Sequence, residues 1–361
     1  MKSDEGFLDM LDKTILIDCL NENVISFSQP RILKTPEKSN SLAFFFISKF
    51  NESSTNTGFA TKCDNMSNYS KLNYFLISLK KFLTKRGLRC PSCNSKDNET
   101  VDKKYIITNL KRCKTCMLLY RIPGTNLEEN KSFYQEKYSQ GFTTDCPNDE
   151  KLNELISNNF KNTEKDYSKY IEILDILNLK INESSPTLFD YGCSWGYGSY
   201  QFKKKFNVDS YEISSPRAKY ARDKLKINVL EESELNSLSS NKKYDIFFMS
   251  HVLEHVPNPS ETLNLGMKLL KMNGFLISFT PNGSMEHKKT NSNWSKSWGM
   301  VHPNFIDEIF YQKFFSENIF YIGSSEYNFK NIKNFINSNQ NYIDNLSGSE
   351  LMIIVKKIKD N

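Results

Sequence analysis

Short apolar runs typical of β-strands recur along the second half of the chain, and helical patterns separate most of the early ones. Strands that alternate with helices pair in parallel as βαβ units, so the pattern predicts an α/β fold with a largely parallel sheet. The seven candidate strands are LFDYG, VDSYEIS, INVLE, YDIFFMS, GFLISFT, IFYIGSS and LMIIVKKI, in chain order from Leu188 to Ile358.

Two amphipathic helical patterns precede these strands. In residues 71–86, apolar side chains recur at helical spacing from Leu72 to Leu83, and lysine and arginine supply the main charges. This pattern predicts a basic amphipathic helix, which either packs on its own domain with its cations in solvent or lies on a membrane or a partner. The second pattern predicts a helical stretch over roughly residues 150–178.

Residues 1–65 form an N-terminal extension of unclear structure, in which short apolar runs alternate with Ser, Asn and Thr. Two interpretations stay open: a small accessory segment, or an upstream extension of a protein whose translation starts at Met66. The patterns divide the remaining chain into residues 66–147, with the basic helix and a cysteine cluster, and a domain over 148–361.

The composition narrows the function classes without choosing one. The 361 residues include 48 Lys+Arg and 42 Asp+Glu, a net charge of +6, with 38% hydrophobic residues. This balance is typical of a globular protein and too mildly basic for an extended nucleic-acid surface. The longest apolar run, residues 42–47, is far shorter than the ~20 residues of a membrane span, and the acidic start lacks the apolar core of a signal peptide. We therefore expect a cytoplasmic protein.

Four of the eight cysteines form two close pairs, CPSC and CKTC, which predict a metal site at 90–116. Their spacing, C-x2-C-x19-C-x2-C, is that of a four-cysteine zinc ribbon, with room for a hairpin between the pairs. No histidine ligand or open position is visible, so the zinc is expected to be structural. Each cysteine pair forms a tight turn, or knuckle. The residue after the knuckle is often glycine, because the turn favours positive φ, but here it is Asn94 and Met117. The predicted ligands are Cys90, Cys93, Cys113 and Cys116.

An apolar strand at 187–191 runs into a glycine-rich turn and then into a helical pattern. Such a turn lets the backbone approach a ligand closely and directs helix N-terminal amides at it. The dinucleotide fingerprint G-x-G-x-x-G fails at two of its three positions. The S-adenosylmethionine pattern, acid-x-G-x-G-x-G, matches at Asp190, Gly192 and Gly196 and departs at Ser194. We expect Asp190 to fix the loop or to face the methionine amino group of the cofactor.

A carboxylate, Glu212, ends the next strand, 20 residues after Gly192. It can accept hydrogen bonds from both ribose hydroxyls of a nucleoside held on the loop; the other interpretation is an ordinary surface glutamate at a strand end. Glu231, Glu232 and Glu234 follow the third strand, where an acid can meet the adenine amino group, and the sequence does not choose among them.

Together with YDIFFMSHVLEHVPNP, LLKMNGFLISFTPN and VHPNFIDEIF, these motifs give residues 150–357 a broad resemblance to class I S-adenosylmethionine-dependent methyltransferases. The resemblance implies a Rossmann-like seven-stranded methyltransferase fold. The order CPSC, CKTC, MLLYRIP and FYQEKY resembles the zinc-ribbon module fused to methyltransferases of sugar and surface-glycan pathways. One departure is Ser194, which replaces the middle glycine, so we expect its local backbone to differ. Trp195 beside it is expected to form a bulky wall near the cofactor.

The resemblance also implies residue roles in the site. Ser250 and His251, at the end of the fourth strand, are expected at the methionine end of the cofactor. His255 and His302 are the candidate catalytic bases, since histidine is the natural base near neutral pH. For His255 the alternative is a structural hydrogen bond at a helix start. The full set of expected cofactor-binding residues is Asp190, Tyr191, Gly192, Gly196, Gly198, Glu212, Ser250 and His251.

Two further expectations concern the segment after the fifth strand. Trp294 and Trp298 lie where this fold inserts acceptor-binding elements, and they either stack on a sugar or another ring or pack within a lid. His287 lies in a polar loop and is expected to be solvated.

The sequence thus predicts an S-adenosylmethionine-dependent methyltransferase with a structural Zn²⁺ that acts on a small molecule or a carrier-linked sugar, in surface polysaccharide biosynthesis. The main alternative is an RNA methyltransferase that holds its substrate through the ribbon and the basic helix. A third reading is a non-catalytic zinc scaffold with a relict nucleotide fold. Because the cofactor carries an activated methyl group, the transfer itself needs no catalytic metal.

Overall fold

The computed structural model describes residues 77–84, 87–104, 108–125, 128–129, 145–181, 183–238 and 243–359. The extension over 1–65, the start proposed at Met66 and the first part of the helix expected over 71–86 lie outside the described residues. Of that helix, residues 77–83 are helical. Within the described ranges, no helix combines the length and the apolar character needed to cross a bilayer.

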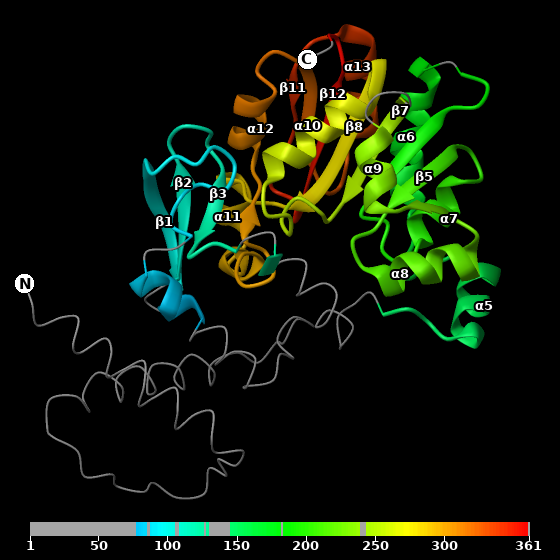
Figure 1. The fold of residues 1–361 in the computed structure, drawn as a ribbon. Helices are drawn as coiled ribbons and strands as arrows, with labels where there is room; N and C mark the ends of the chain where they lie inside the picture. The colour runs from blue at the N-terminus through cyan, green and yellow to red at the C-terminus, as the bar shows by residue number, and fades with distance from the viewer. Residues whose placement is uncertain are drawn as a thin grey trace, which may run out of the picture. The chain divides into compact units, whose positions relative to one another are not determined.

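An eight-stranded sheet forms the centre of residues 145–359 (Figure 1). Its strand order is β11-β10-β12-β8-β7-β4-β5-β6. Strand β12 runs antiparallel to both of its neighbours, and the other pairs are parallel. All seven candidate strands are present, with β11 added at one edge, so the Rossmann-like methyltransferase fold is confirmed. The strands are β4 (Thr187–Tyr191), β5 (Asn207–Tyr211), β6 (Asn228–Leu230), β7 (Tyr244–Ser250), β8 (Leu270–Pro281), β10 (Ile319–Ser324), β11 (Tyr342–Ile343) and β12 (Glu350–Lys356).

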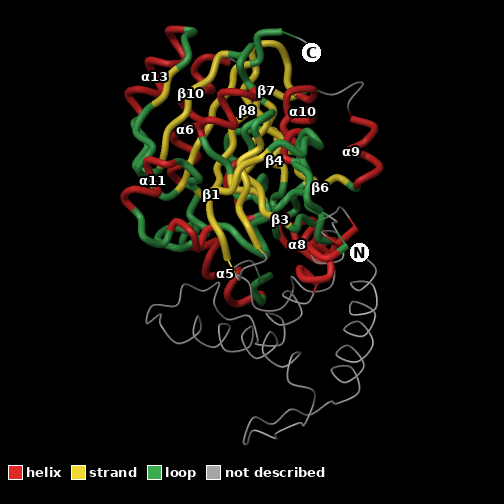
Figure 2. The backbone as a smooth tube through the Cα atoms, turned by 90° about the vertical axis from the view of Figure 1, so that its left-hand side faces the viewer, coloured by secondary structure: helices red, strands yellow, loops and turns green. Residues whose placement is uncertain are grey.

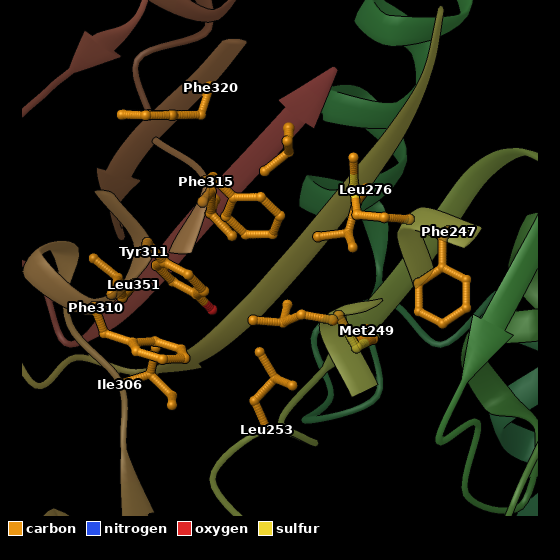
Figure 3. Packing of buried hydrophobic residues seen from close by; sticks show 14 of the residues in the cluster. Phe247, Met249, Leu253, Leu276, Ile306, Phe310, Tyr311, Phe315, Phe320 and Leu351 are labelled. Carbon is orange, nitrogen blue, oxygen red and sulfur yellow. The ribbon is translucent and has the colours of Figure 1, made fainter. Parts of the chain in front are cut away.

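Helices cover both faces of this sheet, and Figure 2 shows α6 and α13 on one side with α10 on the other. Strand β7 is buried between them. Its side chains Ile246 and Phe248 pack with α6 and α13, and Phe247 and Met249 pack into the opposite cluster (Figure 3). A strand buried on both faces is a nearly continuous apolar run, which is why the IFFM segment of YDIFFMS stands out in the sequence. The helices are α5 (Asp149–Ser157), α6 (Ser168–Ile181), α7 (Tyr197–Phe202), α8 (Ser215–Tyr220), α9 (Glu232–Leu238), α10 (Pro259–Leu269), α11 (Met285–Thr290), α12 (Glu308–Phe314) and α13 (Phe329–Ser338).

Two helices, α5 and α6, replace the single helical stretch expected over 150–178. The residues between them include Asn159, Phe160 and Asn162, all with left-handed φ between 53° and 59°. The side chain of Phe160 is fully buried and packs against Trp195, with 6.3 Å between ring centroids. The break therefore brings Phe160 into the core, although no glycine or proline marks it in the sequence.

The cysteine region forms a second, antiparallel sheet with the order β1-β2-β3-β9. The hairpin expected between the two cysteine pairs is made by β1 (Asn98–Lys104) and β2 (Thr108–Cys113), and β3 (Leu119–Ile122) follows. The fourth strand, β9 (Asn304–Phe305), comes from the methyltransferase half of the chain and pairs with β3. The two halves of the described chain therefore share one sheet.

Candidate functional site

The turn after β4 requires glycine at two positions. Gly192 has φ +85°, and a Cβ there would lie 2.5 Å from Cγ2 of Val252. Gly196, the N-cap of α7, has φ +87°, and a Cβ there would lie 2.8 Å from the Cβ of Ala221. Both the left-handed conformation and the close packing exclude larger residues. Gly198 lies inside α7 and packs against the ring of Tyr167. A Cβ at this position would lie 2.5 Å from Cε1 of that ring.

Ser194 takes the left-handed conformation usually reserved for glycine, with φ +54°. The residue change in the motif therefore leaves a glycine-like backbone at this position. Its backbone N–H donates to Oε2 of Glu212 at 2.9 Å. Trp195, expected as a wall beside the cofactor, is 1% exposed and packs in the cluster that contains Phe160 and Ala221.

Glu212 lies directly beside the glycine turn, as its spacing predicts. Its two carboxylate oxygens accept hydrogen bonds from the N–H of Ser194 (2.9 Å) and of Ser214 (2.8 Å). Desolvation raises the pKa of Glu212, and these two donors and Arg217 oppose the shift. A carboxylate oxygen has two acceptor lone pairs, so each oxygen keeps the capacity to accept one further hydrogen bond. The arrangement suits a pair of neighbouring hydroxyls.

Asp190 is 4% exposed and accepts a hydrogen bond from Ser199 Oγ at 2.5 Å. Ser199 in turn lies 2.9 Å from Ser210 Oγ on β5. Burial raises the pKa of Asp190 to about 7. These contacts join the end of β4 to α7 and β5, which agrees with the expected loop-fixing role. Tyr191, the next residue, stacks on Tyr211 with 5.3 Å between ring centroids.

A cavity of about 350 Å³ opens at the carboxyl end of β7. Ser250 and His251 line it, as does Tyr197 at the start of α7. The rest of the wall comes from a segment that no sequence motif marks. This part of the wall consists of Thr163, Glu164, Asp166, Tyr167, Lys169 and Tyr170, before and in the first turn of α6.

His251 lies between two carboxylates. Its Nδ1 is 3.2 Å from Oε1 of Glu254, and its Nε2 is 2.8 Å from Oε1 of Glu350. Desolvation disfavours the charged ring, but the hydrogen bonds to both carboxylates outweigh it and raise the pKa of His251 to about 10. Glu350 also accepts hydrogen bonds from Tyr170 (2.8 Å) and Lys169 (2.9 Å), and its pKa is lowered to about 2 despite burial. A charged imidazolium therefore borders the cavity.

His255 and His302, the two candidate bases, lie together with 4.6 Å between ring centroids. Nδ1 of His255 donates to the carbonyl of Val301 at 2.7 Å, and Nδ1 of His302 donates to the carbonyl of Ser297 at 2.8 Å. Burial lowers the pKa of both rings, to about 4 for His255. The structure thus brings the two candidate bases together, and a carboxylate oxygen of Glu254 lies within 4.8 Å of a ring nitrogen of each.

The expectation for His287 is wrong. Its side chain is buried at 6% exposure, and its Nδ1 donates to the carbonyl of Ser347 at 2.7 Å. Trp294 and Trp298 are each 1% exposed and pack with Leu119 of the ribbon sheet, so packing rather than ring stacking on a ligand describes them here. Trp298 Nε1 also donates to Asp102 at 2.9 Å.

The four cysteines of the predicted metal site converge. Sγ of Cys90 lies 3.5 Å from that of Cys116, Sγ of Cys93 lies 3.4 Å from that of Cys113, and all four lie within 4.8 Å of one another. A tetrahedral zinc site with Zn–S bonds of about 2.3 Å separates its sulfurs by about 3.8 Å, so the cluster fits such an ion.

The two knuckles have the same backbone. In each, the first cysteine accepts from the N–H four residues later, at 2.9 Å, and donates to the carbonyl five residues later. The turns place Asn94 at φ +59° and Met117 at φ +66°, the left-handed conformation that the motif requires. Arg112, which precedes the second cysteine pair, forms an ion pair with Asp307.

Comparison with known proteins agrees with this geometry. Residues 163–331 match the family model described as "Methyltransferase domain". No curated protein matches the sequence. Similar solved structures include the plantazolicin methyltransferase BamL with SAH bound (17% identity, 64% of this chain and 97% of the other, TM-score 0.43). A second is an S-adenosylmethionine-dependent methyltransferase from Clostridium acetobutylicum (13% identity, 58% of this chain and 99% of the other, TM-score 0.40). A third is magnesium protoporphyrin IX methyltransferase from Synechocystis with SAH bound (13% identity, 51% of this chain and 81% of the other, TM-score 0.35). These likenesses are too distant to indicate an acceptor.

The sheet order and the glycine turn after β4 are those of a Rossmann-like fold, and the Glu212 carboxylate lies beside that turn. The family match over residues 163–331 identifies this part of the chain as a methyltransferase domain.

Proposed function

We propose that the enzyme transfers a methyl group from S-adenosylmethionine to a small-molecule or carrier-linked sugar acceptor, in surface polysaccharide biosynthesis. The observation that carries the proposal is the 350 Å³ cavity at the end of β7, whose lining combines tyrosine rings with charged and hydroxyl side chains. Sugars bind in such mixed sites, because their hydroxyls need polar partners while their C–H faces pack on aromatic rings. The four-cysteine module ahead of the methyltransferase domain also favours this class.

For the cofactor we propose that Glu212 accepts the ribose hydroxyls while the Gly192, Gly196 and Gly198 backbone lies against the nucleoside. Support comes from the two backbone donors that fix the Glu212 carboxylate next to the turn. Ser250 and His251 are proposed at the methionine end, with Asp190 and Tyr191 supporting the loop from β4. An imidazolium at His251 suits the carboxylate of the methionine moiety.

The chemistry is an in-line displacement at the methyl carbon of a sulfonium. The acceptor atom forms the new bond, and the electrons of the broken S–CH₃ bond stay on sulfur. The protein aligns donor and acceptor, and a basic group takes the acceptor's proton. We propose His255 and His302 for this role, since they cluster with Glu254, which contacts the cavity-lining His251.

We propose a structural Zn²⁺ on Cys90, Cys93, Cys113 and Cys116. Its thiolates are supported by the paired knuckle turns described above. The proposed divisions are 66–147 for the ribbon region and 148–361 for the methyltransferase domain, with 1–65 as an extension. Lys81, in the basic helix, bonds to Glu129 (2.5 Å) and to the carbonyl of Gly124 (2.9 Å), which favours packing on its own region over an RNA contact.

The test incubates purified enzyme with S-adenosylmethionine labelled in its methyl group. The acceptors are a panel of nucleotide-linked sugars and, in separate reactions, an RNA pool, and the label transferred to each is measured. We expect label in at least one sugar product and none in RNA, and slower transfer by the Glu212→Ala variant when the cofactor is limiting. The matched control is Glu172→Ala, at an exposed position in the middle of α6. Label in RNA alone would overturn the acceptor class, and absence of cofactor binding in the wild-type protein would overturn enzyme function.

A further inference from the structure

Glu254, His255 and His302 form a compact group separate from the four cysteines. One ligand atom from each residue can be chosen so that all lie within 4.8 Å of one another. The first two residues follow β7 on a tight turn, and His302 comes from the segment that leads into β9. Nε2 of His255 lies 3.8 Å from Oε1 of Glu254.

The two rings are held in the tautomer that metal-binding histidines adopt. A carbonyl oxygen can only accept, so the contacts with the carbonyls of Val301 and Ser297 assign the proton to Nδ1 of each ring. The lone pair of each neutral ring is therefore on Nε2. A backbone carbonyl behind the distal nitrogen is the usual support for a histidine that ligates a metal.

The carboxylate of Glu254 supplies the second, independent observation. This residue is 1% exposed, and its Oε1 faces the His251 ring at 3.2 Å. Its Oε2 is buried and has no hydrogen-bond partner among the described residues. A buried carboxylate oxygen without a partner is costly, and a bound cation removes that cost.

We infer that Glu254, His255 and His302 bind a divalent transition-metal ion through one carboxylate oxygen and two imidazole Nε2 atoms. Two histidines and one carboxylate form a ligand set typical of Zn²⁺, Mn²⁺ and Fe²⁺ sites that keep further coordination positions open. The cysteine cluster, with four sulfurs, is closed by its own ligands, so the two sites differ in ligand type and in openness.

With an ion bound, the two histidines would be ligands, so the proton-acceptor role given to them in the proposed function, on which this step rests, would belong to the metal-free protein. Binding of the metal itself does not depend on the acceptor or on methyl transfer.

The test is a Co²⁺ titration of the full-length protein whose ribbon is already loaded with Zn²⁺, with metal content measured by elemental analysis. We expect one Co²⁺ per chain in addition to the zinc, with the weak visible absorption of nitrogen and oxygen ligands and without the intense bands of a cobalt thiolate. Competition by Zn²⁺ or Mn²⁺ should displace it. Wild-type protein that binds no Co²⁺ beyond exchange into the cysteine site would overturn the inference.

Variants then assign the ligands. His302→Gln and Glu254→Gln should each weaken Co²⁺ binding at least about tenfold. His287→Gln is the matched control, because that histidine is also buried with Nδ1 bonded to a backbone carbonyl. Unweakened binding in both ligand variants would overturn the assignment, and the wild-type titration decides the inference if a variant does not fold. Calorimetry with S-adenosylmethionine on the same wild-type sample separates the two proposals: retained cofactor binding without Co²⁺ binding refutes only the metal site.

Discussion

Arg112 on ribbon strand β2 forms a buried ion pair with Asp307, the N-cap of α12 in the methyltransferase half. Asp307 is fully buried, and its other oxygen accepts from the N–H of Phe310 at 3.0 Å. Arg112 also donates to the carbonyl of Met117 in the second knuckle at 2.6 Å. One side chain therefore ties the metal-site turn to the start of a helix some 195 residues further along the chain.

Arg112→Ala should strongly destabilise the protein, because it leaves the Asp307 carboxylate buried without its partner. The expected loss is about 3–5 kcal/mol in the free energy of unfolding, measured by denaturant titration. Lys114→Ala is the control, since its pair with Asp97 is exposed and of little energetic value. Equal effects of the two substitutions would show that the buried pair is not a major contact.

Glu212→Ala should weaken S-adenosylmethionine binding by about 10- to 100-fold, since hydrogen bonds to a charged group contribute roughly 1.5–3 kcal/mol. The same change removes the acceptor of the Ser194 N–H, which loosens the turn. Calorimetry measures the affinity, with Glu172→Ala as the control. An unchanged dissociation constant would remove Glu212 from the cofactor site.

Two substitutions in the glycine turn should show whether the turn depends on its backbone conformation or on the side chain of Ser194. Gly192→Ala places a methyl group 2.5 Å from Val252 at φ +85°, so we expect a loss of more than about 2 kcal/mol in the free energy of unfolding, together with weaker cofactor binding. Ser194→Gly relaxes a left-handed serine and should change stability by no more than about 1 kcal/mol while keeping cofactor affinity. If Ser194→Gly were the more damaging change, the serine side chain would have a role of its own.

Asp190 should make the stability of the cofactor-free enzyme depend on pH. Burial raises its pKa from 3.8 to about 7, so the folded state favours the protonated carboxyl. This contribution is complete below about pH 4 and is lost as the pH rises to about 7, with an expected decrease of a few kcal/mol in the free energy of unfolding. Asp190→Asn, which can still accept from Ser199, should lack this dependence. The check is the difference between the two unfolding curves across that range; a constant difference would contradict the assignment.

Loss of zinc should loosen more than the ribbon. In Cys113→Ser, we expect zinc content to fall and amide-exchange protection to decrease in β3 and in β9, because β9 pairs only with β3 in the described chain. Protection in β4 and β5 and the affinity for S-adenosylmethionine should stay near wild type. Cys146→Ser, at an exposed cysteine outside the cluster, is the control. Unchanged protection at β9 would show that the metal site and this strand are independent.

The sequence predicts the parts of the fold that depend on local pattern. The apolar run of β7 and the spacing from Gly192 to Glu212 both identify features that the structure contains, because a buried strand and a glycine turn restrict residue type locally. The break between α5 and α6 depends instead on burial of Phe160 in a distant cluster. No residue type within that segment predicts the break.

The candidate site divides in the same way. Ser250 and His251 follow a recognisable strand, so their place at the cavity is predictable. Glu350 reaches His251 across 99 positions of sequence, and a lone glutamate at the start of a C-terminal strand gives no signal of that contact. The convergence of His255 with His302 likewise depends on β9, a two-residue strand too short to be read from periodicity.

The shared strand β9 also has a consequence for biosynthesis. The ribosome completes β3 at Ile122 about 180 residues before Asn304 and Phe305 are added. Throughout that interval the nascent ribbon has an unprotected outer edge, which attracts other strands until its own partner arrives. Expression at lower temperature or with a chaperone that shields such edges should therefore raise the yield of correctly assembled enzyme.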